Sequence, residues 1–275
     1  MAILVRLTLR KSLERVYGDP NSVFVTVGDE VLVRTENGLE KARILDKEKK
    51  VTAPKGSVFK IIRKLNAKDL EVLKNNLLKE REALKICMKN IKERDLDMKL
   101  TDVEYTYDRK KLFIYYTSEG RVDFRVLLKD LGVALKSKIQ MVQIGVRDEA
   151  KMIGGLGNCG RELCCKTFIR TFDPVVIDMA KEQHLSLNPS KISGLCGRLV
   201  CCLGYENEFY KQVNMKMPKE GAKVNTPDGE GVVKSTNVLK EEVEILFDDG
   251  TVVNYKLEDL KTKKKSQKPV NETKE

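Results

Sequence analysis

The sequence CGRELCC at residues 159–165 recurs as CGRLVCC at residues 196–202. Both copies share the frame C-G-R-x-x-C-C, and together they hold six of the seven cysteines of the chain. Thiolates are soft ligands that suit zinc, cuprous copper and iron–sulfur clusters. The repeated frame therefore predicts two loops that come together to build a thiolate metal site, around which the rest of the chain is organised.

The spacing within each run leaves the identity of the metal open. Neither run contains the C-x₂-C pair with which many zinc knuckles present two sulfurs from one turn. The C-x₄-C spacing is also found at the start of the plant-type ferredoxin motif, where the longer gap wraps a bulkier cluster. The residues alone favour neither zinc nor an iron–sulfur cluster.

Each run ends in a cysteine doublet, and two neighbouring side chains do not point the same way. They face opposite sides of a strand and diverge by roughly 100° on a helix. We expect one member of each doublet to join Cys159 and Cys196 in a site of four thiolates. Alternatively, each run offers three thiolates and leaves a place for an outside ligand. The candidate metal ligands are Cys159, Cys164, Cys165, Cys196, Cys201 and Cys202.

Disulfide bonds and a set of inert buried thiols are the competing interpretations of these cysteines. Residues 1–10 mix arginines into an apolar run, which predicts a strand rather than a signal peptide. No apolar stretch reaches the length of a membrane span. We therefore expect a cytoplasmic protein without a transmembrane segment, a compartment in which disulfides are rare. The duplicated frame argues against six inert thiols.

The chain carries a net charge of +11, which suits an acidic partner such as nucleic acid, a membrane surface or an acidic protein. Basic residues also surround the cysteine runs in sequence. They either compensate thiolate charge, contact phosphate groups or form an ordinary solvated face, and the sequence does not separate these roles. The weak candidates for nucleic-acid binding are Arg147, Lys151, Arg161, Lys166, Arg170, Lys191 and Arg198.

Two further features could suggest enzyme chemistry, and both are weak. Residues 155–160 match G-x-G-x-x-G, but that fingerprint requires a strand directly before it in a βαβ unit, and residues 147–151 intervene. We expect a bending loop there. His184 is the only histidine, so a His-based catalytic triad is a poor proposal. We expect no enzymatic activity.

Residues 66–97 predict a long amphipathic helix with Asn66 as its cap. Its apolar stripe either packs on a sheet or pairs with another helix. Cys87 lies on this stripe, so we assign it to the core and not to the metal site. The stripe consists of Leu70, Leu73, Leu77, Leu84, Cys87 and Ile91.

The remaining pattern predicts an α+β fold: a central antiparallel sheet with covering helices, a Cys-rich loop and helix segment, and small β units at both ends. Strands are expected at 101–107, 112–117 and 139–146, with a helix at 122–136 between the last two. A further helix is expected at 174–183, capped by Asp173.

Four domains are expected from these elements. They are a small β barrel or meander at 1–64, an α+β core at 65–212 with the metal-binding segment 159–202, an SH3-like β unit at 213–260 and a disordered basic tail at 261–275.

Several stretches between residues 97 and 205 carry a resemblance to a known family. They are GRVDFR at 120–125, IGVRDEAK at 144–151, SLNP at 186–189 and the two cysteine runs. With these residues the chain resembles the bacterial RicT (YaaT) family, whose members carry the polymerase-suppressor C-terminal domain.

The resemblance implies a non-enzymatic subunit of a regulatory complex with two small helical proteins, RicA (YmcA) and RicF (YlbF). That complex holds iron–sulfur clusters and assists ribonuclease Y in RNA processing, with effects on sporulation and biofilm formation. The resemblance also favours a 4Fe-4S cluster over zinc. The alternative function is a zinc-stabilised protein that binds RNA directly, and a redox or nucleotide-dependent enzyme is the least favoured.

Overall fold

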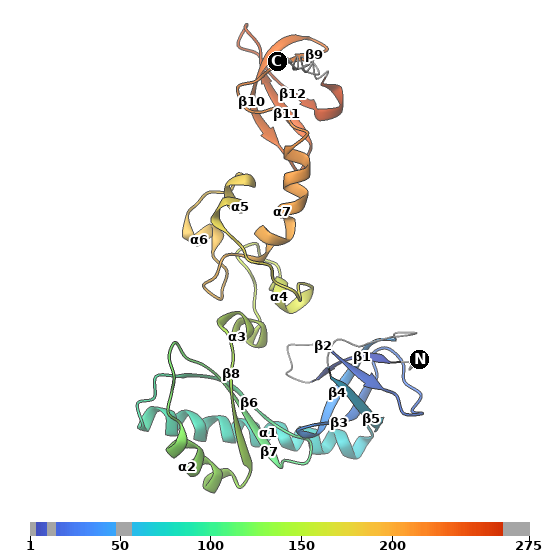
Figure 1. The fold of residues 1–275 in the computed structure, drawn as a ribbon, viewed down its shortest axis with the longest axis vertical. Coiled ribbons are helices and arrows are strands. Elements are labelled where there is room, and N and C mark those ends of the chain that lie inside the picture. Colours follow the sequence, from blue (N-terminus) through green and yellow to red (C-terminus); the bar gives the residue numbers. More distant parts are fainter. Residues whose placement is uncertain (1–3, 10–14, 48–56, 261–275) are drawn as a thin grey trace, which may run out of the picture. The chain divides into compact units, whose positions relative to one another are not determined.

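The computed structural model describes residues 4–9, 15–47 and 57–260 of the chain (Figure 1). The predicted disordered tail at 261–275 lies outside these residues. The chain forms two compact units. One holds Met1–Thr171 and Gly194–Arg198, and the other holds Phe172–Ser193 and Leu199–Glu275.

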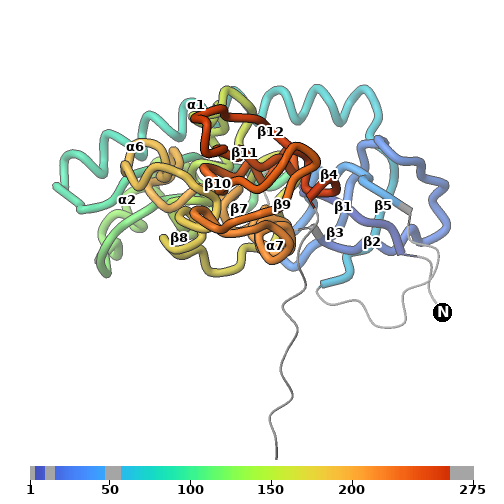
Figure 2. The backbone as a smooth tube through the Cα atoms, turned by 90° about the horizontal axis from the view of Figure 1, so that it is seen from above, coloured from blue at the N-terminus to red at the C-terminus, as the bar shows by residue number. Residues whose placement is uncertain are grey.

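The first unit begins with a closed barrel of five strands in the order β1-β2-β5-β3-β4 (Figure 2). This confirms the small β unit predicted at the N-terminus. Its strand β2 is one that the sequence pattern did not indicate. The strands are β1 (Val5–Leu9), β2 (Arg15–Asp19), β3 (Glu30–Thr35), β4 (Gly38–Lys47) and β5 (Val58–Lys64). The barrel core consists of Val5, Leu7, Val25, Val31, Val33, Ala42, Ile44 and Ile61.

Helix α1 (Ala67–Glu93) follows the barrel and begins at the predicted cap. The Asn66 side chain accepts a hydrogen bond from the Asp69 N–H at 2.9 Å, and the Asp69 carboxylate accepts one from the Asn66 N–H at 2.9 Å. Leu70 and Leu77 of the predicted stripe are exposed and do not pack on the sheet. The buried side chains of α1 are Asp69, Leu73, Asn76, Glu80, Ala83, Cys87 and Ile91.

Three polar residues lie on the buried face where leucines were expected, because each binds the end of one sheet strand or the turn that follows it. Asn76 donates to the Tyr107 carbonyl at 3.1 Å. Glu80 accepts from the Tyr105 N–H at 3.0 Å, and Asp69 accepts from the Tyr107 hydroxyl at 2.6 Å. A buried polar side chain is stable when it is hydrogen-bonded in this way. These contacts fix α1 on the sheet without a continuous apolar seam.

The sheet has the strand order β6-β7-β8 and forms one layer against α1. β6 and β7 are antiparallel, whereas β8 runs parallel to β7, so the predicted antiparallel sheet is wrong for its last strand. The reason is helix α2, a crossover that returns the chain to the same end of the sheet. The elements are β6 (Lys99–Tyr105), β7 (Lys111–Thr117), α2 (Arg125–Leu135) and β8 (Lys138–Gln143).

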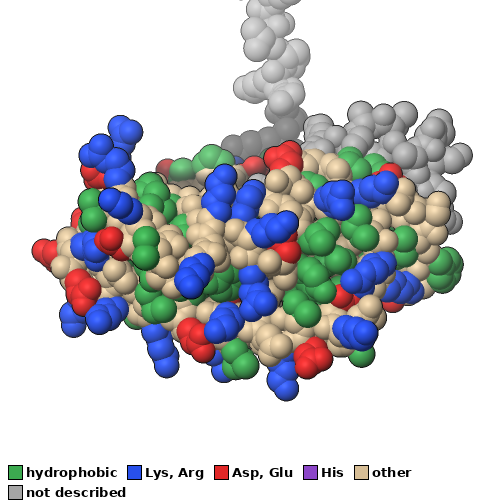
Figure 3. Space-filling view, turned by 90° about the horizontal axis from the view of Figure 1, so that it is seen from below, with side chains coloured by type: hydrophobic (Ala, Val, Ile, Leu, Met, Phe, Trp, Pro, Cys, Tyr) green, Lys and Arg blue, Asp and Glu red, His purple; other side chains and the backbone are tan. Residues whose placement is uncertain are grey.

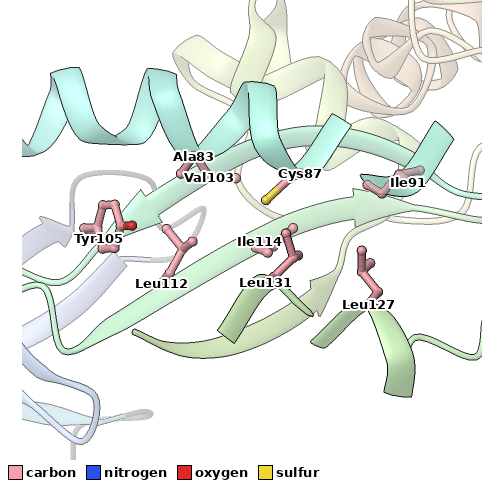
Figure 4. Packing of buried hydrophobic residues seen from close by; sticks show 9 residues of the cluster. All are labelled: Ala83, Cys87, Ile91, Val103, Tyr105, Leu112, Ile114, Leu127 and Leu131. Atoms are coloured by element: carbon pink, nitrogen blue, oxygen red, sulfur yellow. The ribbon is translucent and has the colours of Figure 1, made fainter. Parts of the chain in front are cut away.

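The core of this layer lies between α1, the sheet and α2. Figure 4 shows Cys87 of α1 turned toward the strands, with Leu127 and Leu131 of α2 in the same cluster. The assignment of Cys87 to the core is confirmed, because its side chain is fully buried. The buried cluster consists of Ala83, Cys87, Ile91, Val103, Tyr105, Leu112, Ile114, Leu127 and Leu131.

Two helices follow β8. The predicted strand at 139–146 ends at Gln143, and residues Val146–Ile153 form helix α3 instead. Asp148 and Glu149 lie in its first turn, where acidic side chains oppose the helix dipole favourably. The short helix α4 (Cys164–Thr167) contains the first cysteine doublet.

The second unit begins with α5 (Ile177–Glu182), α6 (Pro189–Ile192) and α7 (Cys201–Asn214). The predicted cap Asp173 is wrong, because α5 starts only after Val176, whose backbone is extended. Val175 lies so close to Gly204 of α7 that a Cβ on that glycine would be 3.1 Å away. Residues 174–176 therefore precede the helix.

The unit ends with a four-stranded antiparallel sheet in the order β12-β11-β10-β9. This confirms a small β unit at the C-terminal end. Its strands are β9 (Lys223–Thr226), β10 (Gly229–Asn237), β11 (Glu242–Leu246) and β12 (Val252–Lys256). In the part of the chain that is described, no helix is both long and apolar enough to cross a membrane.

Candidate metal centre

The first cysteine run forms a tight hairpin that leads into a helix. The Gly157 N–H donates to the Arg161 carbonyl at 2.8 Å, and the Gly160 N–H donates to the Gly157 carbonyl at 2.9 Å. The Leu163 N–H then closes the hairpin on the Gly155 carbonyl at 3.2 Å. We call residues 155–163 the first knuckle. The G-x-G-x-x-G match therefore forms this hairpin and not a dinucleotide-binding turn at a helix start.

The second run repeats the same hydrogen bonds 37 positions later in the chain. The Gly194 N–H donates to the Arg198 carbonyl at 2.7 Å, and the Gly197 N–H donates to the Gly194 carbonyl at 2.9 Å. The Val200 N–H closes this hairpin on the Ile192 carbonyl at 2.9 Å. We call residues 192–200 the second knuckle.

The two knuckles share the backbone geometry that the frame C-G-R-x-x-C-C requires. Gly160 and Gly197 follow the leading cysteines with φ values of +77° and +74°, a conformation that glycine adopts readily. Each doublet then occupies the first two residues of a helix, Cys164 in α4 and Cys201 in α7. The repeated sequence is therefore one structural motif used twice, which presents a thiol at a hairpin tip and two at a helix start.

The six thiols differ in exposure. Cys165 is buried with Ala150 and Leu163, and Cys196 of the second run packs against this cluster. The structure thus brings one thiol of each run together inside the first unit. Cys159 is exposed, and the half-buried thiols are Cys164, Cys196, Cys201 and Cys202.

The two members of the first doublet have different surroundings. Burial raises the pKa of the Cys165 thiol, and the nearby Cys196 adds to this, while the charges of Arg147 and Lys151 oppose it. Cys164 beside it is half-buried. In the second unit, Cys202 contributes to a raised pKa of Tyr210 on α7, after burial and Glu206.

The donor chemistry of these residues suits a soft metal, but their arrangement does not form a closed site. Thiolates are the ligands expected for zinc or an iron–sulfur cluster. Within residues 4–9, 15–47 and 57–260, no three Cys, His, Asp or Glu side chains gather so that they could hold a metal ion. The predicted ligand set therefore remains a prediction.

The basic residues around the runs have separate environments. Figure 3 shows Lys and Arg side chains spread over one face with apolar and acidic groups between them, and not in a single patch. Arg170 donates to the Thr167 carbonyl at 2.8 Å, and Lys166 pairs with Glu162 at 3.7 Å. The exposed candidates are Arg161, Lys166, Arg170, Lys191 and Arg198.

A cleft of about 830 Å³ opens in the first unit where β7 and β8 end and α3 begins. Lys99 and Glu149 form an ion pair of 2.8 Å in its wall, and Arg198 lines it as well. Sequence reasoning missed this cleft. Its lining residues come from four separate segments of the chain, so no local motif marks it.

Two segments of the chain match known protein families. Residues 59–144 match the family described as the PSP1 C-terminal conserved region, and residues 174–217 match the PSP1-like protein third domain. Over 260 residues the chain is 43% identical to stage 0 sporulation protein YaaT of Bacillus subtilis, and the match covers 94% of each protein. The chain belongs to the YaaT family. The resemblance predicted from the sequence is confirmed.

A second relative shares only part of the YaaT-family chain. An uncharacterised protein of Schizosaccharomyces pombe is 36% identical over 85 residues, which cover 31% of this chain and 11% of that protein. No solved structure matches the chain.

Proposed function

We propose that this YaaT-family chain is a non-enzymatic subunit that binds an iron–sulfur cluster and acts in a complex with RicA-like and RicF-like small helical proteins. The complex would assist ribonuclease Y in RNA processing. The observation that carries this proposal is the repeated knuckle and helix start, which presents the same three thiols twice. A motif built twice around cysteines is hard to explain by packing alone.

Support comes from the chemistry of the thiols. A 4Fe-4S cluster, when bound, supplies iron sites that take thiolate ligands. Cys165 and Cys196 already lie together in the first unit, which favours a site that uses both runs. The thiolates would come from Cys159, Cys164, Cys165, Cys196, Cys201 and Cys202.

Support for the process comes from the relative and from charge. The Bacillus subtilis relative is named as a sporulation protein, and we place this chain in the same process. The net charge of +11 favours electrostatic attraction to RNA, since basic side chains bind phosphate groups without sequence specificity. We propose that RNA is contacted through the assembled complex.

The test is to purify the full chain without oxygen and to measure iron, sulfide and zinc together with visible absorption. We expect iron and sulfide in equal amounts and a coloured protein. Cys159→Ser and Cys196→Ser should each lose most of the iron, because no adjacent thiol can replace either residue. Cys87→Ala is the matched control, since its thiol lies in the core and should not affect iron.

Zinc without iron or colour would overturn the iron–sulfur assignment. It would favour the zinc-stabilised protein that binds RNA directly, and that alternative predicts salt-dependent RNA binding by the isolated chain.

A further inference from the structure

One side of α1 combines exposed apolar residues with unpaired basic ones. The exposed fractions are 50% for Leu70, 45% for Leu77 and 56% for Met88. An α-helix has 3.6 residues per turn, so these residues fall along one line, with Leu84 half-buried at its edge. The buried face of α1 points toward the sheet (Figure 4). Leu84 packs against the core cluster under α1. Leu70, Leu77 and Met88 are exposed, so the line follows the border of the buried face.

The charged residues along this line are all basic. Lys74, Arg81, Lys85 and Lys92 fall within about 60° of it around the helix axis and are exposed. Among the described residues, none of these four has an ion pair. We call Leu70, Lys74, Leu77, Arg81, Leu84, Lys85, Met88 and Lys92 the basic apolar stripe.

The acidic residues of α1 lie elsewhere. Glu82 and Glu93 are on the other flank of the exposed surface, where they pair with Lys79 and Lys89 at 3.3 and 3.7 Å. Lysines on that flank thus have partners within the helix, as expected for a solvated face. The stripe differs because its charges have one sign and its apolar groups are open to water.

We propose that the basic apolar stripe is a docking surface for an acidic amphipathic helix of another protein. Apolar residues spaced by three and four on the partner would cover the leucines, and Asp or Glu at its flanks would pair with the four cations. From Leu70 to Met88 the stripe is about 27 Å long, enough for a partner helix of about 18 residues.

Three other occupants fit less well. A second copy of the chain would place like charges against one another across the stripe. A membrane surface favours an apolar face with cations on both of its borders, whereas the four cations lie on one border and the other is the buried face of α1. RNA would pair with the cations but would leave the leucines exposed to water.

The surface goes beyond the proposed function, since none of its residues is a cysteine of the two runs. It therefore stands independently of whether a cluster binds. The full chain with Cys159→Ser and Cys196→Ser should retain all of the binding described below, which keeps a failure of one proposal distinct from a failure of the other.

The test uses two synthetic helical peptides of about 18 residues. Both carry leucines along one face; the first has Glu at the flanking positions and the second has Lys at the same positions. We expect the full chain to bind the acidic peptide about tenfold more tightly than the basic one, because three or four exposed ion pairs contribute that much. Fluorescence anisotropy of labelled peptide at two salt concentrations gives the affinities.

Charge reversal locates the surface. K74E/R81E/K85E should lose about tenfold in affinity for the acidic peptide and should prefer the basic one. K68E/K79E/K89E changes the net charge equally on the other exposed flank of α1 and should bind as the unchanged chain does. Circular dichroism verifies that both variants keep their helix content, as exposed positions should allow.

Four outcomes would overturn the proposal. They are equal affinity for the two peptides, equal loss in the two triple variants, binding of phosphatidylglycerol vesicles in place of peptide, and a dimer of the chain that Leu77→Ser abolishes. The last two would identify a membrane surface or a second copy as the occupant.

Discussion

At the scale of single residues, Cys87 shows how a thiol outside the two runs contributes to the protein. Its side chain is fully buried between α1 and the sheet, beside Ala83 and Ile114 (Figure 4). Burial in this apolar setting raises the pKa of the thiol to about 12, so it stays protonated at neutral pH.

We predict that Cys87→Ser lowers the free energy of unfolding by about 1–3 kcal/mol, because it leaves a buried hydroxyl without a partner. Urea denaturation measures this loss. Cys87→Ala should cost less, since it introduces no polar group. Loss of metal in folded Cys87→Ser protein would contradict the assignment of this thiol to the core.

Asp69 is the residue that joins the barrel, α1 and the sheet. Its carboxylate pairs with Arg63 of β5 and accepts hydrogen bonds from the Asn66 N–H and the Tyr107 hydroxyl. The Arg63 side chain is the main cause that holds the pKa of Asp69 well below its usual range, and the other two donors add to it.

Because the folded pKa is depressed, Asp69 contributes stability that is fully present above the unfolded pKa of about 4 and is lost as the pH falls toward the folded pKa. We predict that Asp69→Asn lowers the free energy of unfolding by about 1–3 kcal/mol at neutral pH. The difference from the unchanged chain should shrink below about pH 4. Urea denaturation across pH 3 to 7 checks both statements, in roughly unit steps.

Asp178→Asn is the matched control, because the pKa of Asp178 is also lowered by a cation, Lys181, but the carboxylate is exposed. An exposed ion pair contributes little. If both substitutions had the same effect, the joining role of Asp69 would be refuted.

At the scale of elements, each knuckle has a glycine directly after its leading cysteine. Gly160 and Gly197 have positive φ values, and in both places open space surrounds the position of a missing Cβ. Only the backbone conformation therefore opposes a side chain there. A residue other than glycine in this region costs roughly 1–2 kcal/mol.

We predict that Gly160→Ala and Gly197→Ala each reduce the iron retained by the anaerobically purified chain, and by similar amounts, because the two hairpins share one hydrogen-bond pattern. Iron per chain is the measurement, with circular dichroism as a check of the fold. Gly120→Ala is the control, since that position also has open space but no positive φ. An equal loss in the control would show that the knuckle geometry is not the cause.

The elements also show how far the sequence alone can lead. The cap Asn66 is a local signal, and the structure has it where it was predicted. The buried face of α1 is different, because Asn76 and Glu80 owe their burial to partners in the β6–β7 turn. Those partners lie about 25 to 31 positions away in sequence, so no helical periodicity can reveal them.

The same distinction between local and long-range signals applies to the candidate metal site. The repeated frame correctly indicated two equivalent loops, because tight turns and helix starts are set by neighbouring residues. Which thiols come near one another depends on how distant segments pack, as the packing of Cys196 against the cluster that holds Cys165 shows. The parallel direction of β8 also depends on tertiary structure, since the crossover helix α2 sets the end of the sheet from which the strand starts.

At the scale of the whole molecule, the six thiols are divided between two compact units. The first unit holds Cys159, Cys164, Cys165 and Cys196, and the second holds Cys201 and Cys202. No group of three metal-binding side chains is present among the described residues. An iron–sulfur cluster that needs more ligands than one run offers must therefore take further ligands from the other run or from a partner protein when it binds.

We predict that the isolated chain holds iron weakly and loses it quickly in air, whereas the complex with RicA-like and RicF-like partners retains it. If the partners complete the ligand set, iron binds the assembled state more tightly than the free chain. Linkage then requires that removing iron weakens assembly by the same free energy. Size-exclusion chromatography of the three proteins before and after anaerobic chelation, with iron measured in every fraction, tests both halves of this statement.

Because iron binding and assembly are linked, measuring both tests the prediction more severely than measuring iron content alone. Partners that merely shield a complete site would slow the loss of iron in air, but they would elute together with the chain whether or not iron is present. Partners that supply ligands must separate from the chain, at least in part, when iron is removed. The result that would contradict this prediction has two parts: the isolated chain keeps full iron occupancy, and the complex elutes unchanged after chelation. It would mean that the two runs form a four-thiolate site by themselves. In that case Cys159, Cys196 and one member of each doublet would be sufficient, and only one substitution in each doublet should release iron.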